Sequence, residues 1–173
     1  ATAIRQKQLA EFNAEEKDLL ESISALKAAI VVLSKHHSSL VQVPRANAVA
    51  MAAMVQNQLQ KHASLLQGVL SPSERRLLAA FSQAPQDYFD AAPTFKQSYA
   101  PQSGEIFGIL KQMKETFESN LSASQKEELA NQKAYEDLKA AKEDEIAAGQ
   151  AQLDSKTKEL AETDEKNAQA KVD

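Results

Sequence analysis

The stretch that decides the fold covers residues 99–121 and reads YAPQSGEIFGILKQMKETFESNL. A segment rich in proline and aromatic residues ends there and a helical pattern begins. The apolar residues of this pattern are four, three, four and four positions apart, which places them on one face of a helix. They are Ile106, Leu110, Met113, Phe117 and Leu121. Ser103 suits the N-cap, and Glu105 lies in the first turn, where the helix dipole favours an acid.

No proline follows Pro101, so a single helix can run from Gly104 towards Lys171. It would be about 100 Å long at roughly 1.5 Å per residue. A compact chain of this length has a radius of gyration of only about 16 Å. Part of the helix must therefore leave the compact body, and we expect the function to lie in that part.

The composition predicts an all-α fold, an elongated helical bundle with a very long C-terminal helix and a coiled-coil-like extension. Of the 173 residues, 43% are hydrophobic and 5% aromatic, with four Gly and five Pro, too few for a sheet-rich chain. We place the bundle body in residues 1–138, including an aromatic and proline strap at 84–103. Residues 139–173 form an acidic helical extension.

The charge is unevenly distributed. Residues 1–104 carry 10 basic and 8 acidic side chains, whereas residues 105–173 carry 10 basic and 16 acidic ones. An acidic helix repels phosphates, so we expect no nucleic-acid partner. No stretch approaches the roughly 18 apolar residues of a membrane span, so we expect no membrane insertion.

Residues 2–37 carry a heptad seam in which apolar residues alternate at spacings of three and four, with a polar interruption at Glu16. The seam consists of Leu9, Phe12, Glu16, Leu19, Ile23, Leu26, Ile30 and Leu33. Two interpretations remain open. The seam is either the buried face of one helix in the bundle or a surface that pairs with another chain, for which Leu9, Phe12, Glu16 and Leu19 are the candidate contacts.

Two further helices are expected in the middle of the body. Pro44 fits the first turn of a helix that runs to about Leu66. Ser71 is followed by Pro72 at the first helical position and by Glu74 three residues after the cap, as a capping box requires. This pattern predicts a short helix at residues 72–83.

The strap that follows holds four aromatic residues, which either pack over the bundle or dock on a neighbouring chain. They are Tyr88, Phe89, Phe95 and Tyr99. About twenty residues without a clear pattern are unusual inside a compact domain, which is why a packed strap is one of the two interpretations.

Beyond Leu129 the apolar face of the long helix thins. Ile146, Leu153 and Leu160 are seven residues apart, one apolar side chain per heptad. So narrow a stripe cannot form a globular core, but it can form a long contact shared with another helix. We infer that this tail is an interface between subunits, or is partly frayed without a partner.

Two acidic clusters in the tail are either a solvated helix face or sites of weak calcium binding shared between packed chains. They consist of Glu143, Asp144 and Glu145, and of Glu162, Asp164 and Glu165. Neither has the spacing of an EF-hand loop, so no cofactor is firmly expected and calcium is the candidate. Bound calcium would lower the repulsion between acidic helices.

Nothing in the sequence indicates an enzyme. Ser24 and Lys27 match a Ser-x-x-Lys motif, but its companion motifs are absent. His36, His37 and His62 could approach each other between antiparallel helices, but a metal site needs further ligands around them.

Three stretches of the chain resemble the trichocyst matrix proteins and the related granule lattice proteins of ciliates and dinoflagellates. They are residues 5–23 (RQKQLAEFNAEEKDLLESI) followed by residues 26–33, residues 99–117, and residues 125–150. The resemblance covers nearly the whole chain and is weakest between Val41 and Ala63. It involves no catalytic signature.

The resemblance implies a structural protein that self-assembles with copies of itself and related matrix proteins. Such proteins are cut from secretory precursors and form the paracrystalline core of an extrusive granule. The expected location is therefore the lumen of a secretory granule, and the extracellular space after discharge, when calcium and water let the lattice expand. The alternative function is a soluble helical adaptor or a calcium-responsive binding module.

Overall fold

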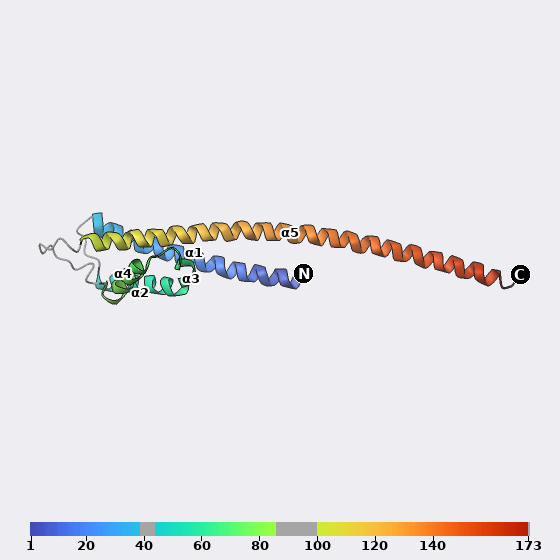
Figure 1. Cartoon of the computed structure of the whole chain (residues 1–173), viewed down its shortest axis with the longest axis horizontal. Helices are drawn as coiled ribbons and strands as arrows, with labels where there is room; N and C mark the ends of the chain where they lie inside the picture. The colour runs from blue at the N-terminus through green and yellow to red at the C-terminus, as the bar shows by residue number, and fades with distance from the viewer. Residues whose placement is uncertain (39–43, 86–99, 173) are drawn as a thin grey trace. The chain divides into compact units, whose positions relative to one another are not determined.

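The computed structural model describes the backbone of residues 1–38, 44–85 and 100–172, and the side chains of residues 1–34, 44–85 and 104–172. Over these ranges the chain forms five helices and no strand, which confirms the predicted all-α fold. Figure 1 labels the helices in chain order. They are α1 (Thr2–Ser38), α2 (Arg45–Lys61), α3 (Ala63–Leu66), α4 (Pro72–Gln83) and α5 (Ala100–Gln169).

Helix α5 has 70 residues, so the very long C-terminal helix is confirmed. It begins at Ala100, four residues before the predicted start at Gly104. Pro101 does not prevent this, because the backbone N–H groups of a first helical turn have no partner within the helix. The predicted apolar face is confirmed as well: Ile106, Leu110, Met113 and Phe117 are fully buried and Leu121 is half-buried.

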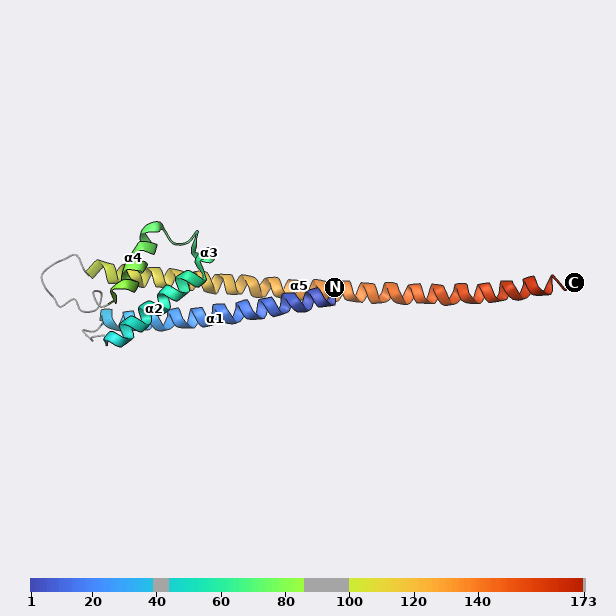
Figure 2. The ribbon, with the colours of Figure 1, turned by 90° about the horizontal axis from the view of Figure 1, so that it is seen from below.

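The packing divides the chain into two units, Ala1–Lys126 (unit 1) and Glu127–Asp173 (unit 2). The sequence places the corresponding boundary between residues 138 and 139. The core lies in unit 1 and combines one face each of α1, α2, α4 and the first turns of α5. Figure 2 shows α1 beside the unit 1 part of α5, as Figure 1 does from another side.

The second helix ends earlier than the sequence predicts. The prediction of a single helix from Pro44 to Leu66 is wrong. The chain leaves the helical conformation at His62, whose backbone angles are φ −108° and ψ 29°. Pro44 precedes the helix as its N-cap. The break separates α2 from the four-residue helix α3, which buries Leu66 in the core.

Helix α4 begins as its sequence predicts. The Ser71 hydroxyl accepts a hydrogen bond from the Glu74 N–H at 3.3 Å, and the Glu74 carboxylate accepts one from the Ser71 N–H at 2.7 Å. This reciprocal pair confirms the capping box. The Arg75 guanidinium also donates to the carbonyl of Gln67 at 2.6 Å, which ties α4 to the turn after α3.

Candidate functional site

Unit 2 is an exposed helix with uncovered apolar side chains. Residues 127–169 are helical, about 65 Å at roughly 1.5 Å per residue. Every side chain from Glu136 to Val172 is exposed. Ile146, Leu153 and Leu160 have exposures of 71%, 60% and 62%. Because steps of seven residues nearly complete two helical turns, these three side chains form one stripe, which we call the tail stripe.

The tail stripe lies on a strongly acidic helix. Unit 2 carries 7 lysines and 13 acidic residues, a net charge of −6. Ion pairs within the helix join Lys139 to Glu143 at 3.6 Å and Lys156 to Glu159 at 2.7 Å. Such exposed pairs contribute only about 0.3–0.5 kcal/mol each to a helix. The charge therefore limits how closely two such helices can pack unless lysines face acids across the contact.

The structure does not gather the candidate calcium ligands into a site within one chain. Within the described residues, no group of three or more acidic or histidine side chains is placed to hold a metal ion. Glu143, Asp144 and Glu145 are consecutive in a helix, so their side chains point in directions about 100° apart. Glu145 is paired with Lys142 at 2.5 Å. Shared calcium binding would therefore need acids from a neighbouring chain, including the second cluster of Glu162, Asp164 and Glu165.

The seam of α1 changes its environment along the helix. Leu19 is 1% exposed and belongs to the core of unit 1, as do Leu26 and Leu33. Leu9 is 42% exposed, whereas Phe12 and Glu16 are half-buried. The seam from Leu19 onwards is thus the buried face of a helix in the chain's own bundle, and Leu19 is not available to a second chain.

Glu16 has a partner within the chain. Its carboxylate accepts a hydrogen bond from the Gln125 amide on α5 at 2.7 Å. The polar residue of the seam therefore joins α1 to α5 inside unit 1. The strap residues Tyr88, Phe89, Phe95 and Tyr99 lie outside the described residues.

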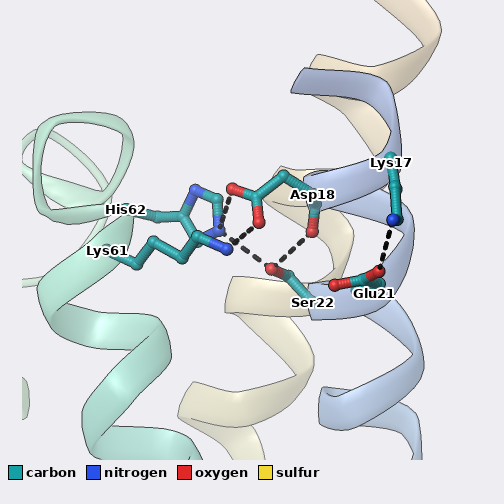
Figure 3. Close-up of polar contacts among 6 residues, drawn as sticks. All are labelled: Lys17, Asp18, Glu21, Ser22, Lys61 and His62. Atoms are coloured by element: carbon teal, nitrogen blue, oxygen red, sulfur yellow. Dashed lines mark hydrogen bonds and ion pairs between the residues drawn. The ribbon is translucent and has the colours of Figure 1, made fainter. Parts of the chain in front are cut away.

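A polar cluster joins α1 to the end of α2, and Figure 3 shows its side chains. The His62 Nε2 is 2.9 Å from the Ser22 Oγ and 3.6 Å from an oxygen of Asp18. The other Asp18 oxygen pairs with the Lys61 ammonium. The sequence singled out His62 but missed its partners, whose only local signal is that Asp18 and Ser22 are one helical turn apart.

The geometry of this cluster differs from that of a catalytic triad. The Ser22 hydroxyl donates to the Asp18 carbonyl at 2.8 Å, so the His62 ring must donate to the hydroxyl and not accept its proton. Serine and carboxylate also meet the same ring nitrogen, whereas a triad uses both nitrogens. Ser22 is 1% exposed. The cluster therefore holds α1 against α2 and has no activated nucleophile.

His62 is buried with 7% exposure, and its ring centroid is 4.7 Å from that of Phe117 on α5. Burial lowers the pKa of the imidazole below its ordinary value of 6.5; the neighbouring Lys61 lowers it further, and Glu15 opposes the shift. The neutral ring is thus the form that fits this position.

An open hollow of about 880 Å³ lies where α4 meets α5, lined among others by Glu74, Arg76 and Glu105. The Glu74 carboxylate is engaged in the capping box, and the hydrogen bonds from Ser71 lower its pKa. This carboxylate therefore stabilises the start of a helix.

No protein-family model, no curated protein and no solved structure matches this chain. None of the helices in the described ranges is both long and apolar enough to span a membrane. The tail stripe, with three large apolar side chains that are 60–71% exposed, is the strongest candidate site.

Proposed function

We propose that this chain is a structural protein that self-assembles through its C-terminal helix into a filament or lattice. The observation that carries the proposal is the tail stripe, three large apolar side chains that are 60–71% exposed on one face of a helix. An isolated helix with so few apolar contacts is marginal in water. Contact with another helix would cover the stripe and stabilise the helix.

The energetics favour assembly by many weak contacts. Full burial of a Leu or Ile side chain contributes about 1.5–3 kcal/mol, so the exposed part of each stripe residue offers roughly 1–2 kcal/mol. Two chains contribute six such side chains, about 6–12 kcal/mol in total. Association costs about 4–15 kcal/mol. A single tail contact is therefore weak, and stable material requires a high local concentration or several contacts per chain.

The resemblance to trichocyst matrix proteins extends this proposal to a biological setting. The assembly would be the paracrystalline core of an extrusive secretory organelle, inside the granule lumen and outside the cell after discharge. Its partners would be copies of the chain and related matrix proteins. The net charge of −6 in unit 2 supports a role for calcium, because a divalent cation reduces repulsion between tails.

Light scattering and electron microscopy of the purified chain test this function. We expect ordered assemblies to appear as the protein concentration rises, and to disappear when residues after Lys139 are removed or when Ile146, Leu153 and Leu160 are all changed to Ser. The matched control changes Ala141, Ala148 and Ala151 to Ser. These residues lie on the opposite face of the same helix and should leave assembly intact. Ordered fibres from the truncated chain would refute assembly through the tail.

A calcium titration distinguishes a matrix protein from an adaptor. At constant ionic strength, we expect calcium to lower the protein concentration at which scattering appears, relative to sodium alone. A chain that stays monomeric, or forms only small discrete particles, over the whole titration would instead be an adaptor.

A further inference from the structure

Two charged residues on the face of the tail stripe, Lys142 and Asp164, lie at equal distances along the chain on either side of Leu153. Ile146 and Leu160 each lie seven residues from Leu153, and Lys142 and Asp164 each lie eleven residues from it. Seven residues are close to two helical turns and eleven are close to three, so all five side chains share one face. From the centre outwards, the five positions are apolar at Leu153, apolar at Ile146 and Leu160, and charged at Lys142 and Asp164. The charges at the two ends are opposite.

We propose that the tail stripe binds a second copy of this chain, with the two helices antiparallel and Leu153 at the centre of the contact. The proposal rests on the proposed function and specifies its partner and orientation. In this register Leu153 faces Leu153 of the second copy, and Ile146 lies level with Leu160 of the second copy. All six apolar side chains enter the contact together.

Charge decides between the two orientations. In the antiparallel pair, Lys142 lies level with Asp164 of the second copy, and the two-fold symmetry gives this attraction twice. In a parallel pair in register, Lys142 would face Lys142 and Asp164 would face Asp164, each a repulsion within the contact. On helices with a net charge of −6, oppositely charged residues at both ends of the apolar stripe favour the antiparallel arrangement.

The side chains of the tail are exposed, as the antiparallel pairing of two tails requires. The Lys142 side chain is 64% exposed, and it forms an ion pair with the exposed Glu145 on its own helix. No side chain of Glu136 to Val172 is buried within unit 2. A second helix can therefore reach the whole face without rearrangement of the first.

Thiol cross-linking tests the orientation, because the native chain has no cysteine. Gly149→Cys and Thr157→Cys introduce thiols at residues that lie level with each other in the antiparallel pair. At Gly149 an added Cβ meets no other atom within 4 Å, so the helix accepts it. Two copies of residue 149 would be about 12 Å apart along the axis at roughly 1.5 Å per residue. In a parallel pair they would be level.

We expect a mixture of the two single variants to give mixed 149–157 cross-links with a short bis-maleimide, and each variant alone to give few. Cross-linked products that join 149 to 149 and 157 to 157 would overturn the antiparallel pairing while leaving self-assembly intact. A chain that remains monomeric at all concentrations would refute both this pairing and the proposed function.

Charge reversal gives a second test that does not depend on cross-linking. Lys142→Glu alone and Asp164→Lys alone should each weaken dimerisation about tenfold, because each creates two like-charge contacts. The double variant should restore the affinity of the native chain. The double variant also lacks the Lys142–Glu145 ion pair. Its recovery would therefore show that the loss of this pair does not cause the effect of Lys142→Glu. Single variants that dimerise like the native chain, or a double variant without recovery, would overturn the register.

Discussion

Phe117→Ala tests whether unit 1 alone carries the stability of the folded chain. Phe117 is fully buried and its ring contacts that of His62. Truncation of a buried phenylalanine costs about 3–5 kcal/mol through lost transfer energy and the cavity left behind. Since small domains are stable by only about 5–15 kcal/mol, we expect the loss of at least about a fifth of the free energy of unfolding.

Leu153→Ala is the matched control, an apolar truncation in the same helix at a position that is 60% exposed. In dilute monomer it should change the free energy of unfolding by less than about 0.5 kcal/mol. Its effect should appear only in assembly, where the side chain would be covered.

Urea unfolding monitored by hydrogen exchange measures the difference in the free energy of unfolding between the two variants, because hydrogen exchange reports on the amides of α1 and α4 separately from those of unit 2. For a urea dependence of about 2 kcal/mol/M, Phe117→Ala should lower the midpoint by about 2 M. A shift below about 0.5 M for Phe117→Ala would refute the assignment of the core. An equal shift for both variants in dilute monomer would refute the distinction between the two units.

Two further predictions concern unit 1. Ser71→Ala removes the cap of α4 and should cost about 1 kcal/mol in urea unfolding, whereas Ser73→Ala should cost much less; equal effects would contradict the capping role. His62 has a lowered pKa in the folded chain, so the unfolded chain binds its proton more readily. The contribution of His62 to the free energy of unfolding should therefore be fully present above a pH of about 6.5, and it should fall as the pH drops towards the pKa of the folded state. His62→Gln should flatten this part of the pH profile of urea midpoints, and an unchanged slope would exclude His62 as its source.

Local patterns predicted the elements that depend on neighbours in the sequence. The spacing of Ile106, Leu110, Met113 and Phe117 indicated the buried face of α5, because residues three and four apart lie on one side of any helix. Ser71, Pro72 and Glu74 indicated the start of α4 in the same way, since both hydrogen bonds of the capping box span three residues.

Local sequence patterns did not predict the break at His62. No glycine or proline marks it, and the residues on both sides suit a helix. His62 instead contacts Ser22, which is 40 residues away, and Phe117, which is 55 residues away. These partners come together only when α1, α2 and α5 have packed.

The sequence by itself determined the all-α fold, the length of α5 and the narrow stripe of Ile146, Leu153 and Leu160, because helical periodicity and the absence of proline act over a few residues. Only the tertiary structure decided that the α1 seam is buried from Leu19 onwards, and that Glu16 binds Gln125, 109 residues later. A repeat shows which side of a helix is apolar, but what covers that side depends on contacts between distant segments.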